Sequence, residues 1–426
     1  MRVAGIVAEY NPFHNGHKYH IEETRMLTGA DYCVVVMSGD FVQRGGPAIV
    51  DKYLRVKSAL ENGADLVIQM PVTGSTLSAG EYAKCGVETL SRLGVVTDLS
   101  FGCEAKNAEE QQLLLKAAGL LHDESGTFQS ILAEGMRSGL TFPVARANAL
   151  CSLLTVDTDR KGILQNVLQA PNNILAMEYL RANMEADHPM HPCMITRFGA
   201  SYHDQSLSDE ESFPSATAIR QYLFDLYSDS DQTDQSYDIL TGHIPASSKQ
   251  QLTEYLTIHR PLSEDVFSDM LFYSLRLQKD NLSERFSQNI ELSNTIKNKL
   301  ETFSDWKTFA LSCKGKNQTL TAVNRYLTHI LLDIDANILS MVRKTGFAPY
   351  ARVLGFRRDA APLLSKMNES AAIPVITHPS KALRNMDTDQ AALFRMDLAA
   401  AELYSYAAAR NRNAIISELR HPLVYL

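Results

Sequence analysis

The sequence of 426 residues has six cysteines, one tryptophan and no long uninterrupted apolar run. Six cysteines without a C-x-x-C pair are too sparse for a disulfide scaffold, so we interpret them as reduced, mostly buried thiols. No stretch approaches the length of about 18 consecutive apolar residues that a membrane-spanning helix requires. The N-terminus has neither a basic segment nor an apolar leader. These absences predict a cytoplasmic protein that has no membrane partner.

The chain also lacks an excess of positive charge. Lys and Arg number 41 against 49 Asp and Glu, which gives a formal net charge of −8. This balance argues against a globally basic nucleic-acid binder and leaves room for a local basic patch. Hydrophobic residues at 45% and charged residues at 21% are typical of a globular protein and exclude disorder as the main state. At roughly 100–200 residues per domain, the length predicts two or three domains.

Short apolar runs alternate with amphipathic segments over the first hundred residues. Predicted strands span Arg2–Glu9, Cys33–Met37, Leu66–Met70 and Val95–Phe101, and predicted helices begin near His17 and cover Lys52–Glu61 and Ala79–Leu93. This alternation predicts a parallel sheet with right-handed crossovers. We interpret Lys52, Arg55 and Lys57 as a solvated helix face rather than an RNA contact.

Helical patterns dominate the rest of the chain. Residues 104–168 are predicted to be mainly helical, and Met194–Arg197 is a short run that can return to the sheet. The acidic, polar stretch Ser228–Asp238 is interpreted as a linker. The predicted fold is α/β: a Rossmann-like parallel-sheet domain over residues 1–227, followed by a mostly helical C-terminal region over residues 239–426.

The strongest chemical signal is the run from Asn11 to His17, NPFHNGH, between the first predicted strand and helix. A helix N-terminus attracts phosphate through its free N–H groups and its dipole. Residues three apart share a helix face, and Gly16 permits close approach of a ligand. We therefore predict that His14 and His17 are catalytic and donate hydrogen bonds to a reacting phosphate. Such a pair by itself also fits a weak metal site, but no further ligands complete a set, so no metal site is predicted.

Two further segments are candidates for phosphate binding. Ser215, Thr217 and Arg220 open a predicted helix in the run SATAIR, and Arg44 lies in the glycine-containing run SGDFVQRGG after the second strand. The alternative interpretations are an ordinary helix cap with a surface arginine and a plain connecting loop. Both alternatives stay open from the residues alone.

The H-x-G-H pattern after the first strand resembles the nucleotidyltransferase superfamily, and SATAIR resembles its second motif. In order along the chain, GIVAEYNPFHNGHKYHI, VVVMSGDFVQRGGPAIVDKYLR, GADLVIQMP, FGCE, PNNILAMEYL, SYHD, SATAIR and PYARVLGF resemble the tRNA(Met) cytidine acetate ligase family. That resemblance implies activation of acetate by ATP, as its Mg²⁺ complex, to acetyl-adenylate. It further implies acetyl transfer to the wobble cytidine of elongator tRNA(Met), which gives N4-acetylcytidine.

The resemblance also implies which residues bind ATP. They are Val7, Ala8, Glu9, Tyr10, Asn11, Phe13, His14, Asn15, Gly16, His17, His20, Gly102, Asn172, Arg197 and Phe198. Their chemistry is compatible with this role, because an amide such as that of Asn172 can read a base or ribose and Arg197 can pair with phosphate.

A local basic stretch contrasts with the acidic total. Arg343, Lys344, Arg352, Arg357 and Arg358 occur with interleaved aromatic residues and without an acidic residue until Asp359. Positive charge suits RNA phosphates and rings suit exposed bases, so we predict a tRNA-binding surface here. A merely solvated face is the alternative.

Two other functions stay open at this point. One is an adenylyltransferase that acts on a small phosphorylated metabolite, which the long C-terminal region disfavours. The other is a non-catalytic RNA-binding protein with ATP as a structural ligand, which the intact His14, Gly16 and His17 disfavour.

Overall fold

The computed structural model of the chain describes residues 1–123, 125–154, 161–197, 215–228, 238, 240–286, 289–315, 318–409 and 417–426. The predicted linker Ser228–Asp238 lies outside these residues except at its two ends. The division at residues 227 and 239 therefore stays a prediction.

One sheet organises the molecule. Its strands are β1 Val3–Ala8, β2 Tyr32–Ser38, β3 Leu66–Met70, β4 Asp98–Cys103, β5 His191–Thr196, β6 Ala351–Phe356, β7 Val375–Ile376 and β8 Val424–Tyr425. The strand order is β5-β4-β1-β2-β3-β6-β7, with β8 also paired to β6. Strands β1 to β5 are mutually parallel and β6 runs antiparallel to β3. The predicted Rossmann-like α/β fold is confirmed.

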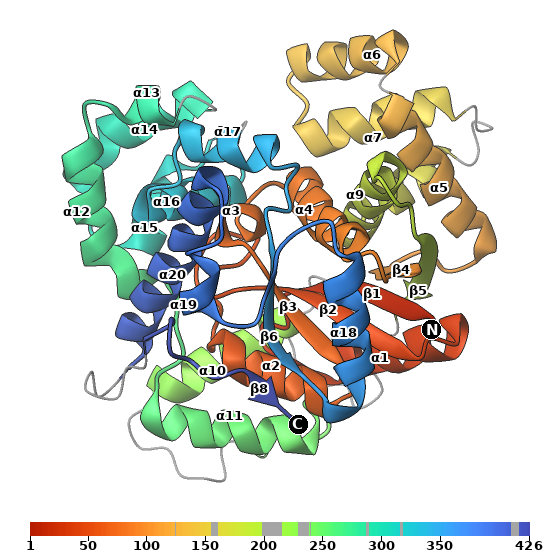
Figure 1. The fold of residues 1–426 in the computed structure, drawn as a ribbon. Helices are drawn as coiled ribbons and strands as arrows, with labels where there is room; N and C mark the ends of the chain where they lie inside the picture. The colour runs from red at the N-terminus through yellow and green to blue at the C-terminus, as the bar shows by residue number, and fades with distance from the viewer. Residues whose placement is uncertain are drawn as a thin grey trace.

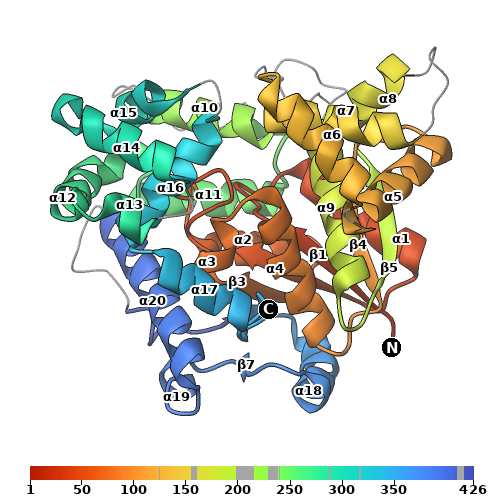
Figure 2. The same ribbon diagram turned by 90° about the horizontal axis from the view of Figure 1, so that it is seen from above.

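Helices cover both faces of the sheet and form a lobe on either side (Figures 1 and 2). The N-terminal part contains α1 Asn15–Thr28, α2 Lys52–Glu61, α3 Val72–Ser75, α4 Ala79–Arg92, α5 Ala108–Asp123, α6 Gly126–Arg137, α7 Phe142–Leu153, α8 Lys161–Gln169, α9 Pro171–Glu185 and α10 Ala216–Ser228. The C-terminal part contains α11 Ala246–Ile258, α12 Ser268–Gln278, α13 Leu282–Arg285, α14 Ile290–Lys299, α15 Trp306–Cys313, α16 Leu320–Leu332, α17 Ala336–Lys344, α18 Ala361–Ser370, α19 Pro379–Ala382 and α20 Thr388–Ala408. Of the described helices, none is both long enough and apolar enough to cross a membrane.

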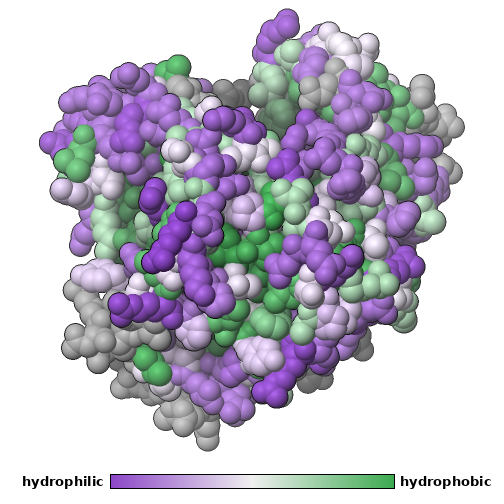
Figure 3. Space-filling view, viewed as in Figure 1, coloured by the Kyte–Doolittle hydropathy of each residue, from purple (hydrophilic) through white to green (hydrophobic). Residues whose placement is uncertain are grey.

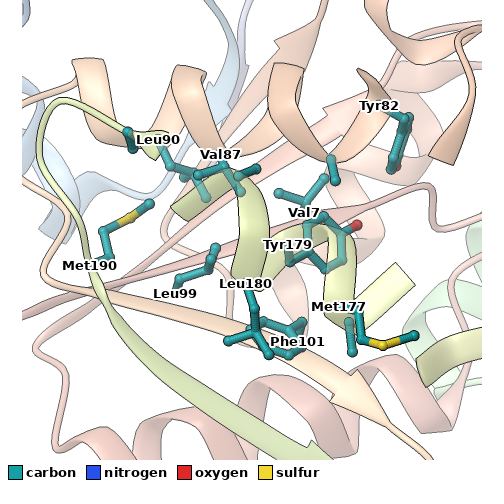
Figure 4. Packing of buried hydrophobic residues seen from close by; sticks show 14 of the residues in the cluster. Val7, Tyr82, Val87, Leu90, Leu99, Phe101, Met177, Tyr179, Leu180 and Met190 are labelled. Atoms are coloured by element: carbon teal, nitrogen blue, oxygen red, sulfur yellow. The ribbon is translucent and has the colours of Figure 1, made fainter. Parts of the chain in front are cut away.

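Alternating residues of the central strands pack against different helices. Val34 and Val36 of β2 belong to the core beneath α4 and α9, whereas Val35 and Met37 pack with α1 and α2. Figure 4 shows the first of these cores, where Leu99 and other strand residues meet side chains of α4 and α9. Burial on both faces explains why these strands read as continuous apolar runs in the sequence.

The chain order creates a switch point between β1 and β4. From β1 the chain adds β2 and β3 on one side, and it then returns to add β4 and β5 on the other. Loops at the carboxyl ends of β1 and β4 diverge there and leave a crevice, which is where open α/β sheets bind ligands. The predicted histidine motif follows β1 directly.

The C-terminal part extends this same sheet. Strand β6 pairs with β3 from Leu66 opposite Phe356 to Gln69 opposite Arg352. The basic stretch that we interpreted as a continuous RNA-binding surface thus contains a strand, whose residues Ala351 to Leu354 are buried.

Helix α2 corrects another interpretation. Lys52 and Arg55 are 1% and 0% exposed, so they do not belong to a solvated face. Arg55 donates to the backbone oxygens of Glu9 at 2.7 Å and Ser38 at 3.0 Å, and it thereby joins the ends of β1 and β2.

Candidate active site

Helix α1 begins at His14, whose imidazole caps it. Nδ1 of His14 accepts from the N–H of Gly16 at 3.1 Å, and Nδ1 of His17 accepts from the N–H of His14 at 3.3 Å. A ring nitrogen that accepts from a backbone N–H carries no proton, so the proton of each neutral ring lies on Nε2. The cap therefore sets both histidines as Nε2–H donors.

Burial keeps these rings neutral. The pKa of His14 is lowered to about 3, first by burial and then by Arg197 and Arg220. The pKa of His17 is lowered by burial, His14 and Arg197, and burial together with Arg197 lowers that of His20 to about 4. The rings of His14 and His17 stack with their centroids 3.8 Å apart. At neutral pH the site thus presents stacked, uncharged hydrogen-bond donors.

A cavity of about 270 Å³, which we call the histidine cavity, opens at the switch point. Its lining consists of Val7, Ala8, Glu9, Tyr10, Asn11, His14, Gly16, His17, Tyr19, His20, Gln43, Arg44, Tyr82, Phe101, Gly102, Asn172, Leu175, Tyr179, Ile195, Arg197, Ser215, Ala216, Thr217 and Arg220. Segments that are far apart in the sequence thus meet around the start of α1, and most of the sequence-predicted site residues are among them.

Three of the predicted ATP-binding residues are not in this lining. Phe13 is 2% exposed and packs edge-on against Tyr10, with ring centroids 4.9 Å apart. Asn15 faces another segment, since its backbone N–H donates to the oxygen of His243 at 2.9 Å. Phe13 and Asn15 therefore pack behind the cavity wall and do not line the cavity. Phe198 lies outside the described residues.

A polar corner closes the cavity at the end of β4. Nη1 of Arg197 donates to Oδ1 of Asn172 at 3.2 Å, and Nδ2 of Asn172 donates to Glu104 at 2.6 Å. A Cβ on Gly102 would stand 3.4 Å from Cγ of Arg197, so the stem of the arginine lies against the backbone of β4 at this glycine. Burial lowers the pKa of Arg197, whose guanidinium remains a cation at neutral pH.

The SATAIR segment supplies a second cationic corner. Oγ of Ser215 accepts from the N–H of Ala218 at 3.1 Å, at the start of α10. Arg220 donates to the backbone oxygen of Asn11 at 2.8 Å and to Oγ1 of Thr217 at 3.0 Å. The segment is therefore tied to the loop after β1 and faces the same cavity as the histidines. This geometry favours an anion-binding role over an ordinary cap with a surface arginine.

Sequence reasoning missed several cavity residues. Gln43 precedes Arg44 in the run after β2, and its backbone N–H donates to Oε1 of Glu9 at 2.8 Å. Because Gln43 is adjacent in sequence to the candidate phosphate-binding residue Arg44, the sequence could have indicated that it lies at the site. Tyr82 and Tyr179 come from the apolar faces of α4 and α9, where they resemble ordinary core residues.

The five candidate tRNA-binding residues do not form one patch. Arg352 is 2% exposed and pairs with Glu418 at 2.6 Å, so the prediction that it binds tRNA is wrong. Arg343 is exposed and pairs with Glu81 at 2.9 Å, and the exposed Lys344 pairs with Asp389 at 2.6 Å.

Arg357 and Arg358 lie at the other edge of the sheet. They follow Phe356, which pairs with the first residue of β3, Leu66. The histidine motif instead follows the last residue of β1. The two arginines therefore stand at the amino edge of the parallel strands, opposite the histidine cavity. Among the residues that the structure describes, no three His, Cys, Asp or Glu side chains cluster as a metal site.

The chain matches known proteins over its whole length. A family model described as HIGH Nucleotidyl Transferase matches residues 1–417. The tRNA(Met) cytidine acetate ligase of Thermoanaerobacter sp. (strain X514) is 34% identical over 427 residues, which cover 100% of both chains. The chain belongs to the tRNA(Met) cytidine acetate ligase family. The member of this acetate ligase family from Acetivibrio thermocellus is 32% identical over 406 residues, 95% of this chain and 94% of its own.

Two solved structures have the same fold as this chain. The apo form I crystal structure of Thermotoga maritima TmcAL has a TM-score of 0.89 at 28% identity and covers 100% of both chains. The form II structure of that protein, bound with alpha-thio ATP, has a TM-score of 0.87 at 28% identity and the same coverage.

Proposed function

We propose that this protein is an ATP-dependent ligase that acetylates the wobble cytidine of elongator tRNA(Met) in the cytoplasm. The observation that carries the proposal is the histidine cavity, in a chain that matches acetate ligases from end to end. Its two Nε2–H donors stand at the N-terminus of α1, in a lining that also holds the cations of Arg197 and Arg220. This arrangement suits a triphosphate whose α-phosphorus is attacked.

In the first step acetate is activated. A carboxylate oxygen of acetate attacks the α-phosphorus of ATP, the bond to the β-phosphate oxygen breaks, and pyrophosphate leaves. Nε2–H of His14 and of His17 donates to the α-phosphate oxygens, where negative charge grows in the transition state. Arg220, Thr217 and Arg44 line the same cavity and would hold the departing pyrophosphate, and Mg²⁺ would enter with the substrate as the magnesium complex of ATP.

In the second step the acetyl group passes to RNA. The N4 amine of the cytidine attacks the carbonyl carbon of acetyl-adenylate, and the bond from that carbon to the AMP oxygen breaks. AMP leaves and the amine loses a proton, which yields N4-acetylcytidine. Because the cytidine must reach the activated acetyl group, the acceptor site must adjoin the histidine cavity.

A two-part assay tests this function. Acetate should stimulate exchange of radioactive pyrophosphate into ATP without any RNA, and labelled acetate should enter a tRNA(Met) transcript only when ATP is present. A transcript with uridine at the wobble position is the matched control and should stay unlabelled. The absence of both reactions from folded protein that binds ATP would overturn the proposal.

The same assay separates the two rival functions. An adenylyltransferase acting on a small phosphorylated metabolite would exchange pyrophosphate with that metabolite and not with acetate. A non-catalytic RNA-binding protein would bind ATP and tRNA without exchange. The end-to-end match to acetate ligases favours neither rival.

A further inference from the structure

A second, larger cavity lies beside the histidine cavity. It measures about 660 Å³ and is bounded by residues of α4, α7, α9 and α16. These helices come from the lobes on either side, and the surface is indented between the two lobes at the top of the space-filling view (Figure 3). Gln43 lines both cavities, so this inter-lobe cavity adjoins the site where acetate would be activated.

A buried ion pair lines the inter-lobe cavity. Arg146 of α7 is 8% exposed and its Nη1 lies 2.7 Å from Oε1 of Glu178 on α9. Nε and Nη2 of Arg146 are buried without hydrogen-bond partners. Leaving such donors unpaired costs about 1–3 kcal/mol per group, so their retention indicates a ligand that satisfies them.

Aromatic rings and further charge complete the lining. Phe142, at the start of α7, is 52% exposed, although its side chain is large and apolar. Phe347 also lines the cavity, with Nζ of Lys84 5.4 Å from its ring centroid. Glu81, which pairs with the candidate tRNA-binding residue Arg343, is also part of the lining. The Glu81–Arg343 ion pair therefore connects the cavity lining to an exposed cation on the outer surface.

We propose that the inter-lobe cavity receives the acceptor nucleoside of the RNA, with the Arg146–Glu178 pair reading its base and Phe142 stacking against it. The proposal rests on the proposed function and names where its second substrate binds. Unpaired bases in RNA are recognised by stacking on aromatic rings and by hydrogen bonds to the Watson–Crick edge. That edge of cytosine offers two acceptors, O2 and N3, for guanidinium donors, and one amine donor for a carboxylate.

The size of the cavity supports this occupant over acetate. Pockets for organic ligands measure roughly 300–1,000 Å³, a range that suits a nucleoside and far exceeds the needs of a two-carbon acid. The opening between lobes also admits a nucleotide that remains attached to a large RNA. Adjacency through Gln43 lets the base edge approach the activated acetyl group.

The test compares the two steps in three variants. Phe142→Ala removes the exposed ring, and Arg146→Lys keeps a cation beside Glu178 but removes the Nε and Nη2 donors. Phe272→Ala, an exposed phenylalanine of α12 outside the cavity, is the matched control. Acetate-dependent exchange of pyrophosphate into ATP reports the first step, and acetyl transfer to a tRNA(Met) transcript reports the second.

We expect Phe142→Ala and Arg146→Lys to lower kcat/KM for tRNA about tenfold or more, as the loss of one stacked base does, with exchange within twofold of wild type. Phe272→Ala should leave both steps at the wild-type rate. Near-normal tRNA acetylation by both cavity variants, or an equal loss of exchange, would overturn the assignment of the cavity. Wild-type protein that fails in both steps would instead overturn the proposed function.

Discussion

The N–H of His14 donates to Nδ1 of His17 across 3.3 Å, so the backbone of one histidine orients the ring of the other. This hydrogen bond belongs to the cap of α1 and also fixes the tautomer that the chemistry needs. The side chain of His17 thus caps the helix and also carries the hydrogen-bond donor that we propose for catalysis, and substitutions can separate the two roles.

Variants of His17 test this double role. His17→Gln places an N–H donor near the position of Nε2, whereas His17→Asn places an acceptor near the position of Nδ1. We expect acetate-dependent pyrophosphate exchange to fall about 10²–10³-fold in His17→Asn, as when an oxyanion donor is removed, and less in His17→Gln. Gln at this position can still accept from the N–H of His14, as Gln390 does from Asp387 at the start of α20, and Asn keeps an acceptor too, so the unfolding free energy should fall by less than about 2 kcal/mol in either variant. Equal exchange rates in the two variants would contradict the donor role of Nε2.

The buried histidines predict a loss of stability in acid. The ordinary pKa of 6.5 applies to the unfolded chain, whereas in the folded protein the pKa is about 3 for His14 and about 4 for His20. The unfolded chain therefore binds more protons than the folded protein as pH falls below 6.5. The free energy of unfolding is highest above pH 6.5, where these histidines are neutral in both states, and it declines toward pH 4. Each histidine contributes about 1.4 kcal/mol per pH unit in this range.

His20→Asn provides the measurement of this slope. Urea unfolding between pH 6.5 and 4.5 should give a slope about 1.4 kcal/mol per pH unit shallower than that of wild type. An unchanged slope would show that His20 titrates in the folded protein as it does in the unfolded chain.

A buried charge cluster attaches the C-terminal segment to the sheet. Oε1 of Glu418 lies 2.6 Å from Nζ of Lys52 and 2.6 Å from Nη2 of Arg352, and Lys52 also pairs with Asp40 at 2.7 Å. Burial raises the pKa of Glu418, but Lys52 and Arg352 outweigh this effect and hold it at about 2.

Glu418→Gln leaves two buried cations short of a counter-charge. We expect a loss of about 3–5 kcal/mol in the unfolding free energy, measured by denaturant titration. Glu369→Gln, on the exposed side of α18, should change it by less than about 0.5 kcal/mol. A loss of that small size in Glu418→Gln would show that the cluster does not hold the C-terminal segment.

The two groups of surface arginines make different predictions for tRNA. Arg343→Ala removes a cation beside the inter-lobe cavity, so affinity for tRNA should fall and the salt dependence of binding should decrease by about 0.7–0.9 in log–log slope. The double variant Arg357→Ala, Arg358→Ala acts at the opposite edge of the sheet and should weaken binding less. A filter-binding titration at several salt concentrations measures both. A larger effect from the double variant would place the RNA at the amino edge.

The local part of this architecture could be predicted from the sequence. Strands β1 to β3 and helix α2 each correspond to one uninterrupted stretch with a recognisable hydrophobic pattern. The predicted bounds of α2 and β3 agree with the structure. The histidine motif is predictable because the strand end, cap and helix start are adjacent in the chain. The grouping of Gly102, Asn172 and Arg197 with it came from family resemblance, since nothing local places them together.

Long-range pairing was not predictable in the same way. Strand β6 carries Arg352, and a charged residue in so short an apolar segment is ordinarily predicted to lie at the protein surface. Its burial depends on Glu418, which lies 66 residues later and approaches through the pairing of β8 with β6. Likewise Arg55 is buried because it binds carbonyl oxygens at two strand ends, a requirement that no spacing on α2 reveals.

Nucleoside analysis of the RNA product is the sharpest test of the proposed acetylation. Elongator tRNA(Met) is incubated with the protein, ATP and acetate, digested to nucleosides, and analysed by mass spectrometry. We predict N4-acetylcytidine in place of the wobble cytidine, dependent on both ATP and acetate. An unmodified wobble cytidine under every condition, with folded protein that binds ATP, would contradict it.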